Sequence, residues 1–378
     1  MTNIVIVGAG IIGSTTAYML ARRGLKVTII DREDEGQATN AAAGIICPWL
    51  TQRRNKAWYE LAKNGARLYP KLIELLKEDG EVETGYKKVG ALDLYNDREK
   101  LQATYNRVMN RKNEAPEIGT VSRLDEEETK KILPLTHEHT YRAVYISGAA
   151  RVDGHALRKA LINGATKHGA TFIKGNAQLT VEGKVVTGVT VNYQKIRTDL
   201  VIATNGAWMN ELLQPLGINF SVHPQKGQII HLRAPINTHQ WPIVKPPNNQ
   251  YILPFEQNRL IIGATNEKKA KFNSHITAGG ISDILTKALK VIPMLYDSKI
   301  EHVKVGFRPF TPQSHPVIGF LPNTKSILLA NGLGASGLTT GPYVGIQLAN
   351  IVLGETYDID LSLYDTSYAL LNKDESND

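Results

Sequence analysis

The stretch IVIVGAGIIGSTTAYMLARRGLKVTIID, residues 4–31, decides the fold of this chain. It opens with a short β-branched run over 3–7, continues with a helical pattern over 11–23, and ends with a second β-branched run over 26–30. Two such runs on either side of one helix predict a β-α-β unit with parallel strands and a right-handed crossover.

The turn between the first strand and the helix carries three glycines in the pattern G-x-G-x-x-G, at Gly8, Gly10 and Gly13. The first allows a tight turn, the second lets a pyrophosphate approach the backbone, and the third lets the helix pack closely on the strand. Ile11 and Ile12 open the helix, where free N–H groups and the helix dipole favour phosphate. The turn therefore predicts a bound dinucleotide.

An acidic residue, Asp31, ends the second strand 18 positions after Gly13. This is close to the spacing of about 20 residues expected of a carboxylate that accepts from ribose hydroxyls. We therefore assign Asp31, with its neighbour Arg32, to the cofactor. The carboxylate would repel a 2′-phosphate, which argues against NADP.

A second glycine pattern, GLGASG over 332–337, lies between a strand-like run over 326–330 and a helix-like run over 344–353. Only 25 residues follow Leu353, too few for another nucleotide unit. What remains is a helix N-terminus whose N–H groups suit the pyrimidine end of a flavin, although a plain capped helix explains the glycines equally well. This contact favours FAD over NAD, and the residues assigned to it are Gly334, Ser336, Gly337, Leu338 and Thr339.

Composition limits the classes of function. The chain has 378 residues, 42% of them apolar, a net charge of +8 and one cysteine, Cys47. Its basic residues are scattered, so we expect a solvated surface and no nucleic-acid partner. The start lacks a basic signal-peptide region and no run of about 18 apolar residues occurs, so we expect a cytoplasmic protein without a membrane span. A peripheral membrane contact and a homo-oligomer stay open.

Two kinds of sheet alternate along the chain. Apolar runs typical of buried parallel strands occur near the N-terminus and at 199–203, whereas strands at 86–95, 141–146, 222–232, 251–255 and 260–264 indicate an antiparallel sheet. Helices are expected at 58–77 and 154–168. We predict a mixed α/β (α+β) fold in which a Rossmann-type FAD-binding domain (1–80, 150–212 and 306–378) carries an inserted, mostly antiparallel β substrate-binding domain (81–149 and 213–305).

Seven motifs, all in family order, resemble those of the D-amino-acid oxidase superfamily, in particular glycine oxidases and bacterial D-amino-acid dehydrogenases. Besides the opening stretch they are ATNAAAGIICP (38–48), ARVDGHAL (150–157), DLVIATNGAW (199–208), PQKGQ (224–228), GFRPFTPQSHPVIG (306–319) and NGLGASGLTTGP (331–342). The resemblance implies a discontinuous FAD domain and an antiparallel substrate domain, in agreement with the strand pattern.

The resemblance also implies site residues. In the matching positions Arg308 clamps the substrate carboxylate and Tyr251 borders the same pocket. No cysteine lies near 306–310, so we expect non-covalent FAD. The residues expected along the flavin are Thr39, Asn40, Ala43, Gly44 and Ile45, and those expected to close on the ADP part are Asn205, Gly206 and Trp208.

Besides the missing cysteine near 306–310, the chain departs from the family in two further respects. Asn249 stands where glycine oxidases commonly have a histidine, two positions before the tyrosine, and the chain is shorter than typical D-amino-acid dehydrogenases. These departures bear on which amine is the substrate.

Arg308 suits its implied task because a planar guanidinium grips a carboxylate through two parallel hydrogen bonds. A structural ion pair is the alternative. With the carboxylate held, hydride transfer from Cα to flavin N5 needs a neutral amine and a dry approach rather than a strong base. The product imine would hydrolyse to a 2-oxo acid and ammonia, or to an aldehyde and an amine, and oxygen or a quinone-type acceptor would reoxidise the flavin.

We therefore predict oxidative deamination of a small amino acid, either a D-amino acid or a glycine-type amine. The alternatives are a secondary-amine oxidase of sarcosine or proline type, a flavin-dependent tRNA-modifying enzyme, and an FAD-binding protein without catalysis. Ser336 lacks the turn and the histidine partner of a hydrolase.

Three other features have simpler interpretations. His137 and His139 form an isolated H-x-H, so we predict no metal. Cys47 is expected to be an inert buried thiol, and Lys226 a surface lysine at a strand end.

Overall fold

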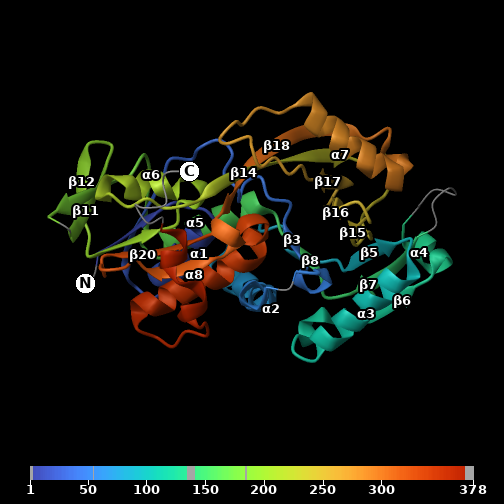
Figure 1. Cartoon of the computed structure of the whole chain (residues 1–378), viewed down its shortest axis with the longest axis horizontal. Helices are drawn as coiled ribbons and strands as arrows, with labels where there is room; N and C mark the ends of the chain where they lie inside the picture. Colours follow the sequence, from blue (N-terminus) through green and yellow to red (C-terminus); the bar gives the residue numbers. More distant parts are fainter. Residues whose placement is uncertain (1–2, 54, 134–140, 184, 371–378) are drawn as a thin grey trace.

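The computed structural model describes residues 3–53, 55–133, 141–183 and 185–370. Two large sheets dominate it. Figure 1 shows the six-stranded sheet with helices α1, α5 and α8 toward the left, and the eight-stranded sheet with α3, α4 and α7 toward the right.

The six-stranded sheet has the order β19-β20-β13-β1-β2-β9 and is parallel except for the pair β19–β20. Because β1 lies between β2 and β13, the glycine turn that follows it emerges near the middle of the sheet. The strands are β1 (Asn3–Val7), β2 (Lys26–Asp31), β9 (Thr171–Lys174), β13 (Leu200–Ala203), β19 (Val317–Phe320) and β20 (Ile327–Asn331). Helices α1 (Ile11–Arg22), α5 (Gly154–Lys167) and α8 (Gly337–Leu353) pack against it, and α2 (Lys56–Glu78) packs on α8 and α5.

The eight-stranded sheet has the order β18-β14-β17-β16-β15-β5-β7-β6. Every neighbouring pair is antiparallel except β15–β5. Its strands are β5 (Ala91–Tyr95), β6 (Val121–Leu124), β7 (Arg142–Ile146), β14 (His223–Arg233), β15 (Ile243–Lys245), β16 (Tyr251–Pro254), β17 (Arg259–Gly263) and β18 (Lys299–Phe310). The predicted fold class, a Rossmann-type unit combined with a mostly antiparallel sheet, is confirmed; the division of the chain into five domain segments stays a prediction.

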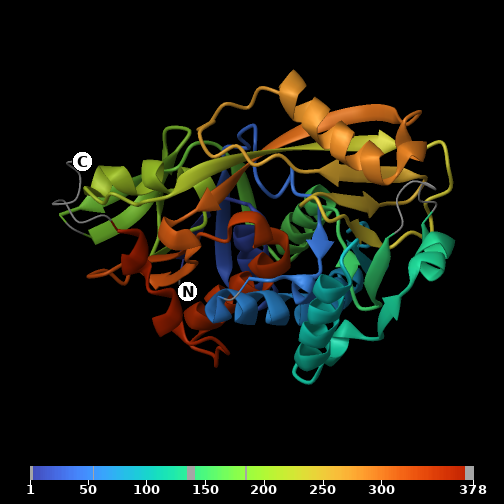
Figure 2. The ribbon, with the colours of Figure 1, turned by 45° about the vertical axis from the view of Figure 1, so that its right-hand side comes forward.

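Several elements escaped the sequence patterns. The helices α3 (Arg98–Lys112) and α7 (Ala278–Val291) each bury only three residues. Figure 2 shows α7 lying over strands of the eight-stranded sheet, where it contacts β14 and β17. The predicted strand range 86–95 is divided into β4 (Lys87–Lys88) and β5. The other elements without a prediction are α4 (Glu126–Ile132), α6 (Met209–Leu213), the strands β6, β9, β15, β18 and β19 of the two large sheets, and the short strands β3 (Ile45–Ile46), β8 (Ala150–Arg151), β10 (Gln178–Glu182), β11 (Val185–Val191) and β12 (Gln194–Arg197).

Helix α8 begins at Gly337, seven residues before the apolar run that predicted it. Its first two turns contain Pro342, whose missing N–H leaves the carbonyl four residues earlier without an intrahelical donor. That carbonyl belongs to Leu338, and the buried Tyr69 hydroxyl of α2 donates to it. A tertiary hydrogen bond thus compensates for the proline.

The prediction for Lys226 was wrong. This side chain is 1% exposed, near the middle of the long strand β14 rather than at its end. Its Nζ donates to the carbonyl of His275 at 2.7 Å and lies 3.2 Å from Glu267 Oε2. Both partners lie on the segment 264–277 that connects β17 to α7, so the lysine holds this connection against the sheet.

A histidine pair joins β14 to β18. His231 lies opposite His302, with ring centroids 4.0 Å apart, and its Nε2 is buried without a hydrogen-bond partner among the described residues. Burial, followed by the influence of His302 and Lys304, lowers the pKa of His231 to about 3. The folded protein therefore keeps this imidazole neutral in mild acid, whereas the unfolded chain protonates it.

We predict that the free energy of unfolding falls as the pH drops from about 6.5 toward 3, because the unfolded chain then binds a proton that the folded chain does not. Urea unfolding at several pH values between about 7 and 4 measures the effect. His231→Phe should flatten the dependence, and His275→Phe, at an exposed position, should not. Equal slopes in wild type and His231→Phe would contradict the assignment.

Candidate cofactor and substrate site

A cavity of about 590 Å³ runs from the glycine turn after β1 to Arg308 on β18. We call it the cofactor cavity. This volume is in the range of about 300–1,000 Å³ typical of sites for small molecules and cofactors. Of the sequence-predicted residues it is lined by Gly8, Gly10, Ile11, Ile12, Asp31, Arg32, Thr39, Ala43, Gly44, Ile45, Asn205, Gly206, Trp208, Tyr251, Arg308, Gly334, Gly337, Leu338 and Thr339.

The glycine turn is built by close contacts. Gly8 has φ +96°, and a Cβ there would lie 2.6 Å from the carbonyl oxygen of Thr204. Gly13 does not line the cavity; a Cβ at this position would lie 2.0 Å from the Gly8 carbonyl oxygen, so it sets how closely α1 approaches the turn. Ile11 N donates to Thr39 Oγ1 at 3.0 Å, and Gly10 caps the helix without a side-chain bond. The first-turn N–H groups of α1 thus open on the cavity without intrahelical acceptors.

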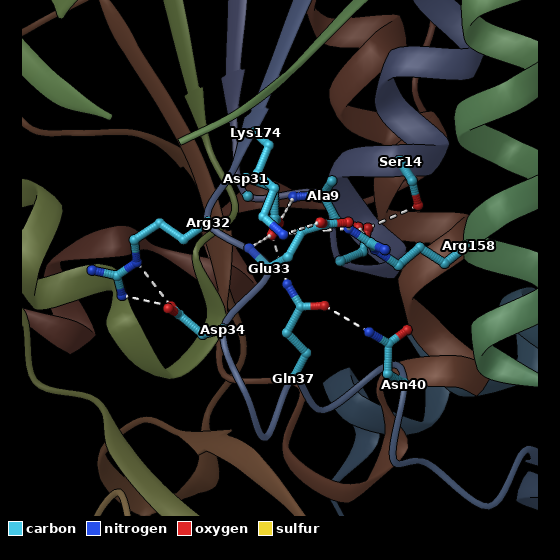
Figure 3. Close-up of polar contacts among 12 residues, drawn as sticks. Ala9, Ser14, Asp31, Arg32, Glu33, Asp34, Gln37, Asn40, Arg158 and Lys174 are labelled. Atoms are coloured by element: carbon cyan, nitrogen blue, oxygen red, sulfur yellow. Dashed lines mark hydrogen bonds and ion pairs between the residues drawn. The ribbon is translucent and has the colours of Figure 1, made fainter. Parts of the chain in front are cut away.

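Asp31 organises the loop that follows β2 (Figure 3). Its Oδ1 accepts from Glu33 N and Gln37 Nε2, each at 2.6 Å, and its Oδ2 accepts from Ala9 N. A carboxylate oxygen can accept two hydrogen bonds, so Oδ2 keeps the capacity for one more donor. Asp31 is therefore compatible with the predicted ribose contact. It also holds the glycine turn at Ala9 and the loop at Glu33 and Gln37 in place.

Arg32 lines the cavity through a side chain that other residues already hold. It pairs with Asp34 at 2.8 Å and with Glu211 at 2.7 Å. Figure 3 shows the pair with Asp34 set apart from the Asp31 network.

Arg158 is a positioning residue that sequence reasoning missed. From α5 its Nε donates to the Ala9 carbonyl at 2.7 Å, and its Nη2 lies 3.9 Å from Asp31 Oδ1 and 3.7 Å from Glu33 Oε1 (Figure 3). A buried cation therefore ties the glycine turn to the end of β2. The sequence offered one indication of this role: Arg158 directly follows ARVDGHAL, one of the motifs shared with the D-amino-acid oxidase superfamily.

The loop after β2 returns along the cavity. Gly44 has φ +95°, and a Cβ there would lie 1.8 Å from the Val152 carbonyl oxygen, so only glycine fits. Asn40, in contrast, does not line the cavity: its amide donates to Gln37 Oε1 at 2.7 Å, and its Oδ1 lies 3.3 Å from His155 Nδ1.

The second glycine turn brings the N-terminus of α8 to the cavity. Gly337 begins the helix, no side chain caps it, and Thr339 Oγ1 donates to the Ile45 carbonyl at 3.0 Å. Ser336 does not line the cavity, because its hydroxyl accepts from Trp58 Nε1 at 2.9 Å.

The turn after β13 closes another side of the cavity. Trp208 stacks on Phe272 with ring centroids 5.2 Å apart and meets Phe307 edge to face. Phe272 belongs to the segment 264–277 that Lys226 holds, so this segment reaches across to the six-stranded sheet.

These features fit FAD. Two helix N-termini without side-chain caps, those of α1 and α8, face one elongated cavity, as a pyrophosphate and an electron-rich ring would require. Asn205, at the cavity wall, has a buried Oδ1 without a hydrogen-bond partner in the described chain. A single cavity lined by two anion-attracting helix N-termini is what one dinucleotide needs.

Arg308 and Tyr251 lie at the far end of the cavity. Arg308 donates to the Thr265 carbonyl at 3.2 Å and to Gln225 Oε1 at 3.4 Å, and no carboxylate of the described residues pairs with it. Burial lowers the pKa of the Arg308 guanidinium, yet arginine remains charged at working pH. Burial also raises the pKa of Tyr251 to about 12, so its hydroxyl remains a donor.

Two glycines that sequence reasoning did not assign make room for this pair. A Cβ at Gly227 on β14 would lie 2.5 Å from Arg308 Nη2, and one at Gly263 would lie 3.0 Å from the Tyr251 hydroxyl. Gly227 is part of PQKGQ, so the motif was visible although its task was not.

We predict that Gly227→Ala displaces the Arg308 guanidinium and lowers kcat/KM about three- to tenfold, less than the loss of a whole hydrogen bond to a charged group, because the guanidinium shifts but remains in the site. FAD content should stay unchanged because the added methyl meets only a side-chain end. Steady-state kinetics beside the flavin-to-protein absorbance ratio test this; unchanged kinetics would show that Arg308 relaxes without loss of function.

The remaining sequence assignments have mixed outcomes. Cys47 does not line the cofactor cavity, and burial raises the pKa of its thiol to about 12. His137 and His139 lie outside the described residues, so the absence of a metal stays a prediction. No helix in the described ranges has the length and apolar character needed to cross a membrane.

Comparison with known proteins identifies a family and several similar proteins. A family model described as "FAD dependent oxidoreductase" (DAO) matches residues 3–351. An uncharacterized oxidoreductase, YurR of Bacillus subtilis, is 52% identical over 372 residues, 98% of this chain and 100% of that protein. The crystal structure of iminodiacetate oxidase from Chelativorans sp. BNC1 superposes with a TM-score of 0.92 at 41% identity, covering 96% of this chain and 98% of that one. A glycine oxidase of Pseudomonas aeruginosa is 30% identical over 96% of this chain and 98% of its own length.

Proposed function

The chain belongs to the DAO family of FAD-dependent oxidoreductases, and on that premise we propose that it oxidises the C–N bond of a small amine carboxylate, foremost an N-substituted glycine. It is an FAD-dependent enzyme of the amino-acid and amine oxidase type. The finer assignment rests on one observation: Arg308 is a partly buried cation without a carboxylate partner among the described residues, at the end of the cofactor cavity.

Arg308 would bind the substrate carboxylate with its guanidinium fork, because its planar donors match that geometry. Tyr251 would donate its hydroxyl to the same substrate. The largely apolar lining of the cofactor cavity would exclude water on the flavin side of this pair and so strengthen both interactions. Bound FAD supplies the acceptor for the two electrons that leave the carbon next to nitrogen as hydride.

Similarity to iminodiacetate oxidase favours a secondary amine over glycine as substrate. Asn249 supports this, since glycine oxidases commonly have a histidine at that position. For a secondary amine the imine hydrolyses with one water to an aldehyde or oxo acid and a primary amine. Oxygen or a quinone-type compound is the proposed terminal acceptor; the homo-oligomer and the cytoplasmic location stay predictions.

An anaerobic substrate screen tests the proposal. The purified holoprotein is mixed with glycine, sarcosine, iminodiacetate, D-amino acids or either proline isomer, and the visible absorbance of the flavin is followed. We expect rapid bleaching by at least one N-substituted glycine. If none of these compounds bleached the flavin, the proposal would be overturned. Retention of the protein on immobilised tRNA that disappears as the salt concentration rises would favour the RNA-modifying alternative instead.

A further inference from the structure

A second cavity, of about 890 Å³, adjoins the cofactor cavity. We call it the outer cavity. Of the described residues three line both cavities: Tyr251, Arg308 and Ala335. A substrate whose carboxylate is held at Arg308 thus has the flavin region on one side and the outer cavity on the other. A substituent of the substrate that does not fit into the cofactor cavity has room in the outer cavity.

The outer cavity carries an excess of positive charge. Its wall contains Lys268, Lys287 and Arg308 but a single carboxylate, Asp283. Asp283 is already paired, since its Oδ2 lies 2.8 Å from Lys287 Nζ. Lys268 and Arg308 have no ion-pair partner in the part of the chain that the structure describes. Two uncompensated cations therefore face one space.

The wall also carries the polar turn 248–250, which hydrogen bonds hold in place. Asn248 accepts from Gln250 N at 3.2 Å and donates to the Lys287 carbonyl at 3.2 Å, which attaches the 248–250 turn to α7. This turn presents Asn249, at φ +61°, to the outer cavity. The residue that replaces the histidine of glycine oxidases is thus an uncharged hydrogen-bonding group beside the two cations.

Lys268 is held near this wall by the backbone before it. Thr265 N and Glu267 N donate to the carbonyls of Gln228 and Lys226 on β14, at 3.1 and 3.0 Å. The segment is therefore attached to the sheet immediately before Lys268, which fixes where the backbone of this residue lies; its exposed side chain lines the outer cavity from there.

We propose that the outer cavity is a subsite for a second carboxylate of the substrate, with Lys268 as its counter-charge and Asn249 as a neutral partner. This rests on the proposed function and deepens it: the substrate class is an amine that carries two carboxylates, one for Arg308 and one for the outer cavity. With the neutral amine that hydride transfer needs, such a molecule has a net charge of −2, which balances the two free cations of the site.

Two secondary amines that differ only at this point test the proposal. Sarcosine has a methyl group where iminodiacetate has a carboxymethyl group. We expect the holoenzyme to prefer iminodiacetate in kcat/KM. Lys268→Glu should lower that value about tenfold or more, mainly through KM, and change sarcosine less than twofold. A higher salt concentration should lower the ratio of kcat/KM for iminodiacetate to kcat/KM for sarcosine, because salt screens the charge of Lys268.

Lys269→Glu is the matched control, because it changes the net charge equally at an exposed neighbour that lines neither cavity. It should leave the ratio of the two substrates unchanged. If Lys268→Glu and Lys269→Glu lowered kcat/KM for iminodiacetate equally, the effect would come from the net charge of the protein, and the subsite would be overturned. The subsite would also be overturned if Lys268→Glu lowered kcat/KM equally for iminodiacetate and for sarcosine.

Binding is measured beside turnover, by titrating each compound against the flavin spectrum. If neither amine is oxidised but iminodiacetate binds about tenfold more weakly to Lys268→Glu than to wild type, the proposed reaction fails and the subsite stands. If sarcosine is oxidised and iminodiacetate neither binds nor reacts, the reaction stands and the subsite fails.

Discussion

Replacing Arg308 with alanine is expected to lower kcat/KM for the best amine carboxylate by about 10- to 150-fold, the loss of 1.5–3 kcal/mol of hydrogen bonding to a charged group. The loss should lie mainly in KM, because the guanidinium holds the carboxylate in both ground state and transition state. FAD content should not change, since the contacts with the two helix N-termini are made elsewhere.

Arg308→Lys separates charge from geometry. A lysine keeps the charge but not the two parallel donors, so an intermediate loss is expected. Arg259→Ala is the control, because Arg259 lies in the same sheet on β17 and lines neither cavity. Wild-type kinetics in Arg308→Ala would mean that Arg308 is a structural residue whose partners are Gln225 and the Thr265 carbonyl.

The parts of the site that the sequence predicted are those made by contiguous residues. The turn at Gly8, Gly10 and Gly13 needs only a strand, a helix and three glycines in register, so its pattern is complete within one short segment. The α8 turn is likewise local, although Pro342 concealed where the helix begins. Local geometry is encoded locally, and pattern analysis recovers it.

The missed parts depend on pairing between distant segments. Arg158 lies 149 residues from Ala9, whose carbonyl it binds. Gly227 matters only because β14 pairs with β18 in a register that sets it beside Arg308. Arg308 itself was assigned by resemblance, because nothing adjacent in the chain distinguishes it from a structural arginine. Lys226 was misjudged for the same reason: the segment that buries it lies some 40–50 residues later.

Replacing Gly13 with alanine is expected to remove most of the bound FAD and to lower the free energy of unfolding by about 1–3 kcal/mol, the usual cost of overpacking. A Cβ at this position would lie 2.0 Å from the Gly8 carbonyl oxygen and 2.5 Å from Thr204 Oγ1. Neither Gly8 nor Thr204 is free to retreat: the Thr204 hydroxyl donates to that same carbonyl at 2.7 Å, on a buried strand end. Helix α1 must therefore move away from the turn.

That movement would act on the cofactor directly. The first-turn N–H groups of α1 and the approach at Gly10 hold their positions only while the helix stays close to β1. The flavin-to-protein absorbance ratio after purification, with urea unfolding, measures both effects. Gly279→Ala is the control, since Gly279 lies in the first turn of α7 with nothing within 4 Å of an added Cβ. It should retain FAD; a Gly13→Ala protein that also retained it would show that α1 can shift without opening the phosphate site.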